Sequence, residues 1–177
     1  MYDKNFQILL LGHPELRKTA QPIIDISSNQ TQSFLDNLLQ FVHDKKGMGI
    51  AAPQVGISER IFIMCSQPNT RYPYAPDMKP TAIINPEITW LSAETEKDWE
   101  GCLSVPGVRA LVPRHTSIKV KFTSRQGDVI ETEYSGFLAR IFQHEFDHLE
   151  GNVFLDRVEN SHEIMMEQEW LKMINQS

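Results

Sequence analysis

The motif His144-Glu145-Phe146-Asp147-His148 constrains this chain more than any other segment. Apolar residues flank it at helical spacings without an intervening proline or glycine, which predicts a helix from about Phe137 to Leu149. Residues four positions apart share one face of a helix, so the two imidazoles can converge on a single cation. Glu145 would project beside that cation without having to be a ligand. The motif therefore predicts a metal site with an adjacent carboxylate.

A catalytic tetrahedral metal site needs three protein ligands and an open position for water, so the third ligand has to come from another segment. Side chains with suitable chemistry, besides several carboxylates, are Cys102, Cys65, His115 and His162. We favour Cys102, because Gly101 permits close backbone approach and the segment 100–107 is rich in turn-forming residues. Cys65 follows an apolar run and is interpreted as a packed thiol. The histidines without paired spacing are interpreted as surface or loop residues: His13, His43, His115 and His162.

The remaining chain predicts short strands and two further helices. The expected helices run from Ser27 or Ser28 to just before Gly47, and from about 160 to 174, the second opening with a capping box of Asn160 and Glu163. The proline- and tyrosine-rich segment 66–80 predicts a surface loop. The expected strands are 61–65, 81–85, 87–91 after a break at Pro86, and a hairpin of 118–122 with 129–134. Strands followed by a helix that carries the chemistry predict an α+β fold.

Composition and charge narrow the function classes. The chain has 177 residues, 41% of them hydrophobic and 23% charged, which predicts a single domain over residues 1–177. A formal net charge of -6 and the lack of a Lys/Arg block argue against nucleic-acid or membrane binding. No run approaches the roughly 18 apolar residues of a membrane span, and the N-terminus lacks the features of a secretory signal. We therefore expect a cytoplasmic protein with free thiols.

Three segments resemble, in the family's order, the signature motifs of the peptide deformylases. They read GMGIAAPQVG at 47–56, EGCLS at 100–104 and QHEFDHL at 143–149. Two flanking segments, 13–17 and 151–157, resemble the family's N-terminal segment in shortened form and the run after its metal helix. Most of the chain is covered, apart from the Pro/Tyr loop and the last turns. The resemblance implies mixed antiparallel sheets around the helix that carries the histidine motif, with an N-terminal and a C-terminal helix.

The resemblance also implies a role for each matched residue. Cys102, His144 and His148 would hold the metal, and Glu145 would act as general acid and base. Gln54 and the backbone N–H of Leu103 would face the developing oxyanion. The implied substrate-binding residues are Gly47, Met48, Gly49, Arg109 and Ile141.

Each of these roles has a simpler alternative when the residue is considered without the family. Gln54 could cap a turn, and the glycines could only end a helix. Met48 and Ile141 could belong to the core, and Arg109 could be a solvated surface residue.

The implied activity is metal-dependent removal of the formyl group from the N-terminal formyl-methionine of new polypeptides, with release of formate. The His₂Cys set suits Fe²⁺, Zn²⁺, Ni²⁺ or Co²⁺, and the resemblance favours Fe²⁺ in the cell and another of these ions in purified protein. The implied partners are formyl-methionyl nascent peptides, with transient proximity to the ribosome, and the state is a monomer or a homodimer. Two rival functions are a metalloendopeptidase that uses the same helix and a non-catalytic relative that keeps the metal for stability or binds peptides.

Three further features carry hypotheses. Arg140, one turn before His144, is expected to pair with Asp98 or another acid near Cys102. The loop 66–80 either covers the pocket or is an inert excursion. The tail 159–177 carries four glutamates against Lys172, which disfavours docking on the ribosome. Its apolar residues are expected to pack on the domain or on a second copy: Met165, Met166, Trp170 and Met173.

Overall fold

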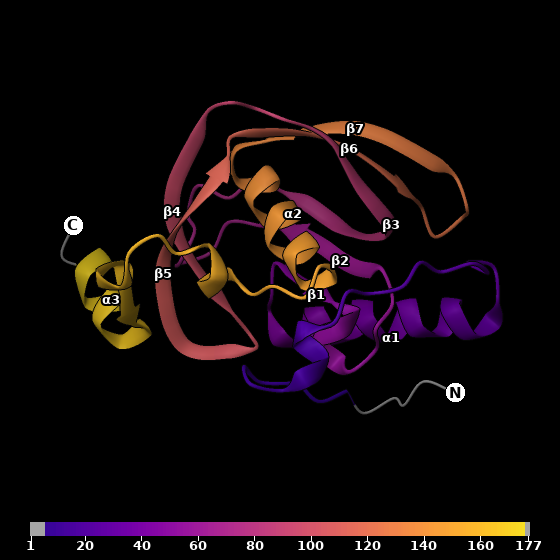
Figure 1. Cartoon of the computed structure of the whole chain (residues 1–177), viewed down its shortest axis with the longest axis horizontal. Helices are drawn as coiled ribbons and strands as arrows, with labels where there is room; N and C mark the ends of the chain where they lie inside the picture. Colours follow the sequence, from indigo (N-terminus) through magenta and orange to yellow (C-terminus); the bar gives the residue numbers. More distant parts are fainter. Residues whose placement is uncertain (1–5, 176–177) are drawn as a thin grey trace.

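Two antiparallel sheets and three α-helices form the computed structural model, which describes residues 6–175 (Figure 1). One sheet has the strand order β1-β2-β3-β6-β7 and the other β4-β5-β8. The strands are β1 (Gly49–Ala51), β2 (Ile61–Ser66), β3 (Met78–Leu91), β4 (Thr95–Cys102), β5 (Val105–His115), β6 (Ser117–Thr123), β7 (Val129–Ser135) and β8 (Ile164–Met166). The helices are α1 (Asn29–Lys45), α2 (Gly136–Leu149) and α3 (Glu167–Asn175), and short 3-10 turns cover Pro14–Arg17, Ala52–Val55, Phe154–Arg157 and Ser161–Glu163. The predicted α+β class is confirmed.

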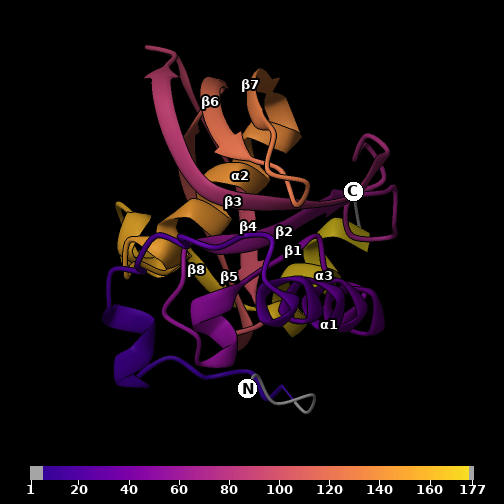
Figure 2. The same ribbon diagram turned by 90° about the vertical axis from the view of Figure 1, so that its right-hand side faces the viewer.

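The five-stranded sheet lies between α1 and α2 (Figure 2). Side chains of β2 alternate between the two faces: Phe62 and Met64 pack in the cluster that contains the apolar residues of α2, whereas Ile61 and Ile63 pack with α1. Phe142 of α2 meets Phe62 edge to face, with ring centroids 5.1 Å apart. The helix that carries the histidine motif is therefore fixed by burial of its apolar face on this sheet.

The first helix agrees with its prediction. Its N-cap is Ser28, whose hydroxyl accepts a hydrogen bond from the N–H of Thr31. It ends where Lys46 adopts a left-handed conformation with φ of 51°. This end places Gly47 and Met48 directly before β1.

Pro86 does not break the strand as predicted, because β3 runs without interruption from Met78 to Leu91. The register of β3 with β6 shifts between Ile84 and Glu87, and Asn85 has φ of 49°. The Asn85 side chain accepts from the N–H of Ile23 and donates to its carbonyl, each at 2.8 Å. An irregularity of this kind accommodates proline inside a sheet, since the missing N–H is then not required for the ladder.

Strands β4 and β5 were not predicted, although they form the wall that faces α2. Their pairing joins Glu100 to Ala110 and Cys102 to Val105, so that Gly101 alone lies opposite the four residues 106–109. Charged residues of low strand propensity dominate β4, which explains why its pattern gave no strand signal. The turn expected within 100–107 is confirmed at Leu103 and Ser104.

The predicted helix 160–174 is wrong in its first half. Asn160 caps only a 3-10 turn, accepting from the N–H of His162, and β8 follows before α3 begins at Glu167. Pairing of β8 with Val108–Ala110 of β5 outweighs the local helical pattern. Trp170 of α3 is 2% exposed, which confirms that this side chain packs on the domain, whereas Met166 stays largely exposed.

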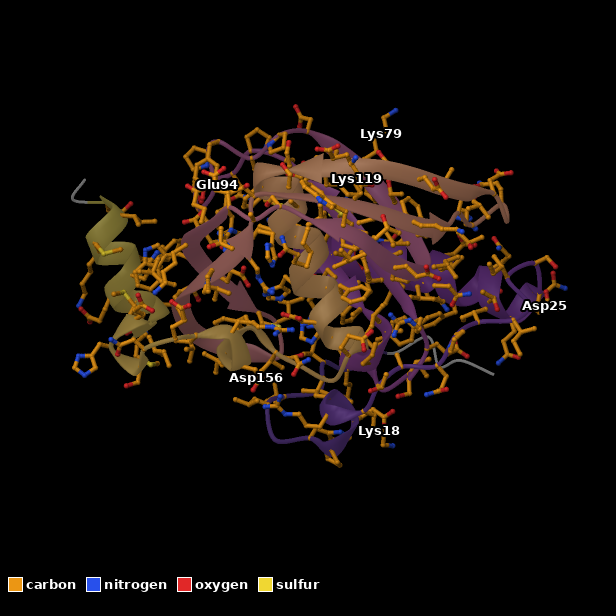
Figure 3. All side chains as sticks on the ribbon, turned by 45° about the horizontal axis from the view of Figure 1, so that its top comes forward. Lys18, Asp25, Lys79, Glu94, Lys119 and Asp156 are labelled. Atoms are coloured by element: carbon orange, nitrogen blue, oxygen red, sulfur yellow. The ribbon has the colours of Figure 1, made fainter. Side chains whose placement is uncertain are left out.

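Most charged side chains lie around the outside of the molecule, as the labelled Lys79, Glu94 and Asp25 illustrate (Figure 3). Among residues 6–175, no helix has both the length and the apolar character that a membrane crossing requires. A small group of charged residues is instead buried beside α2, and it belongs to the site described next.

Candidate active site

Cys102, His144 and His148 converge at the end of β4 and along one face of α2. Their ligand atoms lie within 4.8 Å of one another. Sγ of Cys102 is 3.3 Å from Nε2 of His148, and the two imidazole centroids are 5.3 Å apart. Spacing of four residues on a helix explains the approach of the histidines, and the β4–β5 turn brings the sulfur. Cys65 is also a free thiol but donates to the carbonyl of Gly47 and is not part of this cluster.

The donor set fits a divalent cation. One thiolate sulfur and two imidazole nitrogens suit a tetrahedral ion with one position left open. Burial, followed by the charges of His144 and Arg114, lowers the pKa of His148 well below its ordinary value, and a neutral imidazole is the form that binds metals. Oε2 of Glu145 is buried with no hydrogen-bond partner in the described part of the chain, as a carboxylate facing a bound ion or water would be.

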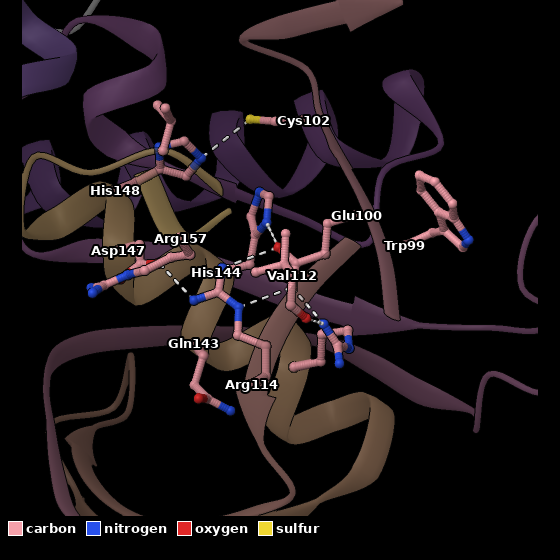
Figure 4. Close-up of polar contacts among 12 residues, drawn as sticks. Trp99, Glu100, Cys102, Val112, Arg114, Gln143, His144, Asp147, His148 and Arg157 are labelled. Atoms are coloured by element: carbon pink, nitrogen blue, oxygen red, sulfur yellow. Dashed lines mark hydrogen bonds and ion pairs between the residues drawn. The ribbon is translucent and has the colours of Figure 1, made fainter. Parts of the chain in front are cut away.

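Glu100 links this cluster to two buried arginines (Figure 4). Its Oε2 lies 2.9 Å from Nδ1 of His144. Because an ionised carboxylate only accepts, Nδ1 carries the proton, and Nε2 remains available to a cation. Arg114 and Arg140 both donate to Glu100 at 2.9 Å. Burial opposes ionisation of Glu100, but the charges and hydrogen bonds of Arg114 and His144 together outweigh it, and the pKa of this carboxyl falls far below its ordinary value.

The hypothesis for Arg140 is confirmed in its broader form. The acid near Cys102 with which it pairs is Glu100, and its guanidinium also donates to the carbonyls of Val112 and Glu96. Asp98 accepts from the hydroxyl of Tyr74 instead. Trp99 points away from the site (Figure 4).

Glu145 is buried and packs directly against the backbone of Gly49. A Cβ at position 49 would come within 2.7 Å of Cδ of Glu145, so any larger residue would displace the carboxylate. Burial raises the pKa of Glu145 to about 7. Gly49, an implied substrate-binding residue, thus also gives space to the acid.

Gln54 caps a turn and also reaches the cluster. Its Oε1 accepts from the N–H of Ala51, which fixes the amide so that Nε2 donates to Sγ of Cys102 at 3.3 Å and to Oγ of Ser104 at 3.2 Å. The backbone N–H of Ser104 also donates to Sγ. Both interpretations of Gln54 are therefore compatible, since one end of the amide serves the turn and the other end serves the site.

A cavity of about 280 Å³ opens onto Glu145 and the cluster. All predicted substrate-binding residues line it: Gly47, Met48, Gly49, Arg109 and Ile141. Leu103 and Gln54 line it as well. Arg109 is 5% exposed, so its interpretation as a solvated residue is wrong. Arg71 and Tyr72 also contribute to the wall, which places part of the 66–80 loop over the pocket.

Several residues of the site were not found from the sequence. Ser104, Glu100 and Arg114 belong to or follow strands that gave no pattern, and their roles depend on contacts between β4, β5 and α2. Glu167 lines the cavity from the C-terminal segment, whose glutamates the sequence indicated only as an acidic surface. The available signal was the EGCLS motif itself, whose first residue is Glu100.

Comparison with known proteins gives one consistent result. The model of the family described as polypeptide deformylase matches residues 5–163. Peptide deformylase 2 from Nostoc sp. is 48% identical over 170 residues, covering 96% of this chain and 95% of that protein. The Met-Ala-Ser-bound structure of a class I type b peptide deformylase from Acinetobacter baumannii has a TM-score of 0.85 and 42% identity, covering 86% of this chain and 98% of that one. The peptide deformylase from Thermotoga maritima has a TM-score of 0.78 and 38% identity, covering 88% and 98%. The chain belongs to the polypeptide deformylase family.

Proposed function

We propose that Cys102, His144 and His148 hold a divalent metal ion and that Glu145 moves the proton in the reaction of this chain, which is hydrolysis of the formyl amide of formyl-methionyl peptides. The observation that carries the proposal is the convergence of the three ligand side chains, two of which, Cys102 and His144, line one cavity together with Glu145. The ion in the cell is Fe²⁺, with Zn²⁺, Ni²⁺ or Co²⁺ as substitutes in purified protein, since all four suit a His₂Cys set. The enzyme works in the cytoplasm as one catalytic domain.

When bound, the ion would make water nucleophilic near neutral pH and polarise the formyl carbonyl. Glu145 accepts a proton as the water oxygen attacks the formyl carbon, and it returns this proton to the nitrogen as the C–N bond breaks. Formate and a free N-terminal amine result. The buried position of Glu145 against Gly49 holds its carboxylate at the cavity floor, where this transfer takes place.

Gln54 and Leu103 stabilise the negative charge that develops on the formyl oxygen. The Oε1 contact with Ala51 leaves Nε2 of Gln54 directed at the cluster, and Leu103 lies directly after Cys102. A preorganised donor of this kind typically contributes about 3–4 kcal/mol to the transition state.

The remaining lining of the cavity binds the peptide. Met48 and Ile141 offer flexible apolar walls that suit a methionine side chain. Gly47 and Gly49 expose backbone at the cavity, and Arg109 supplies N–H donors for peptide carbonyls.

The test is release of formate from formyl-Met-Ala-Ser by protein purified without oxygen and loaded with Fe²⁺ or Ni²⁺. Glu145→Ala should lower kcat by about 100- to 10,000-fold while metal content stays at one ion per chain, because only proton transfer is lost. Glu150→Gln is the matched control, since Glu150 follows α2, pairs with Arg60 and lies outside the cavity lining. It should keep the parent's kcat.

Two results would contradict the proposal. Absence of formate with every metal, despite one bound ion per chain, would favour the non-catalytic relative. Cleavage of internal bonds in unformylated peptides would favour the metalloendopeptidase.

A further inference from the structure

The C-terminal segment supplies an acid to the wall of the active-site cavity. Glu167, the first residue of α3, accepts hydrogen bonds on one oxygen from both Nε and Nη2 of Arg109. Both residues line the cavity. Arg109 is almost fully buried, so this contact determines where its guanidinium lies more strongly than a surface ion pair would.

Two further contacts hold the same guanidinium. Its Nη1 donates to the hydroxyl of Tyr72 at 2.9 Å, and this hydroxyl donates in turn to the carbonyl of Trp99 on β4. Burial raises the pKa of Tyr72, so its hydroxyl stays protonated and able to donate. The guanidinium carbon also lies 4.7 Å from the ring centroid of the buried Trp170 on α3.

Gly101 gives the guanidinium its place against β4. A Cβ at this position would come within 2.6 Å of Cζ of Arg109, so the side chain lies directly on the backbone next to Cys102. A guanidinium carries one N–H on Nε and two on each Nη. After the bonds to Glu167 and Tyr72, one N–H on each Nη has no partner within residues 6–175. These donors are free for carbonyl groups of a peptide in the cavity.

Glu167 and Trp170 lie beyond the part of the chain that the family model matches. The family model ends at residue 163, whereas Glu167 and Trp170 follow it. The short strand β8, paired with β5 at Val108–Ala110, attaches this extra segment beside Arg109.

We infer that Glu167 is a positioning residue for the peptide portion of the substrate, acting through Arg109 with help from Tyr72 and Trp170. The inference depends on the proposed function, in which Arg109 binds peptide carbonyls. Glu167 does not touch the reacting atoms, so its loss should weaken peptide binding and leave the chemical step intact.

The experiment compares Glu167→Ala, Glu167→Gln and the parent with formyl-Met-Ala-Ser as substrate. Glu167→Ala should raise KM about tenfold and change kcat by less than about twofold, because the guanidinium is no longer held. Glu167→Gln keeps one acceptor oxygen in the same place, so most of the parent's KM should return. The dissociation constant of the product Met-Ala-Ser, measured by calorimetry, should rise in parallel with KM.

Glu169→Ala is the matched control on the same helix. Glu169 is exposed, pairs with Lys172 and does not line the cavity, so its replacement should leave KM unchanged. The inference is overturned if Glu167→Ala keeps the parent's KM and product affinity, if only kcat falls, or if Glu169→Ala has the same effect. If Glu167→Ala fails to fold, the test uses Glu167→Gln and Arg109→Lys, provided that Glu167→Gln keeps the parent's melting temperature. Glu167→Gln should then keep the parent's KM, whereas Arg109→Lys, which lacks the planar fork of N–H donors, should raise it. If the parent releases no formate, the proposed function fails, and product affinity alone still decides the inference.

Discussion

Two arginines of the same strand make a natural comparison. Arg109 and Arg114 both lie on β5, and each is 5% exposed. Arg114 pairs with Glu100 and Asp147, whose side chains are 5% and 6% exposed. Arg109 pairs with Glu167, whose side chain is 31% exposed. The arginines are equally buried, but only Arg114 has partners that water cannot reach.

This difference in the exposure of their acidic partners predicts different roles for the two arginines. If Arg114 is removed, the buried carboxylates of Glu100 and Asp147 each lose one of two guanidinium partners, and water cannot replace it. If Arg109 is removed, Glu167 can turn toward water. We therefore expect the Arg114 cluster to hold the fold and the metal ligands, and the Arg109 cluster to control substrate binding.

The largest expected effect is the loss of stability in Arg114→Leu. Removing one partner of a buried pair typically costs about 3–5 kcal/mol. Arg109→Leu should cost only about 1 kcal/mol, since its acid becomes solvated. Urea unfolding of both variants measures the free energies directly. Equal losses would show that exposure of the partner does not distinguish the two clusters.

The next effect concerns metal affinity. Glu100→Gln should lower it by about 10- to 100-fold, because the carboxylate that orients His144 is lost. Asp98→Asn is the control, since Asp98 lies on the same strand but, among residues 6–175, bonds only to the exposed Tyr74 and to the N–H of Trp99. Competition with a chelator gives both affinities. A Glu100 variant with undiminished affinity would remove Glu100 from the metal site.

A smaller effect is expected for Gly101→Ala. The added methyl group would displace the guanidinium of Arg109, so KM for formyl-Met-Ala-Ser should rise about fivefold at nearly constant stability. In an Arg109→Ala background the same change should add nothing, because the group that it displaces is absent. Additive effects in this double-mutant cycle would argue that Gly101 acts independently of Arg109.

The smallest expected effect concerns the ion pair of Arg17 and Asp156, which lies at the surface outside both clusters. Burial works against ionisation of Asp156, but hydrogen bonds from Arg17 and from the N–H of Val153 lower its pKa. A carboxyl whose pKa is lowered in the folded state stabilises the fold at a pH above its unfolded pKa of about 3.9. This contribution is lost as the pH falls through the folded pKa. Asp156→Asn should thus cost less than about 1 kcal/mol at pH 7 and nothing in strong acid. Unfolding curves at both pH values test this, and a cost that persists in acid would contradict it.

The sequence predicted the parts of the site that depend on local spacing. His144 and His148 lie on one helical face because their separation is close to one turn, and the helix itself follows from its apolar pattern. Cys102, Gln54 and Leu103 came from motifs that resemble those of a known family, and all three line the cavity or contact the cluster.

The parts that were missed depend on contacts between distant segments. Nothing in the residues around Arg114 indicates that Asp147, 33 positions later, will neutralise it. Likewise, the helical pattern that begins at Asn160 contains no sign that β5 will draw residues 164–166 into a sheet. Local propensity is weak compared with tertiary pairing, and only the folded chain shows which pairing occurs.

The unequal pairing of β4 and β5 has a consequence for chain length. Gly101 alone faces residues 106–109, so β5 contains surplus chain on the substrate side of the hairpin. Insertions or deletions at 106–107 can be absorbed by this bulge, while the pairings of β4 with β5 at Glu100 and Cys102, and of Val108 and Arg109 with β8, are kept. The hairpin can therefore vary the size of its substrate pocket without moving the sulfur that it presents to the metal.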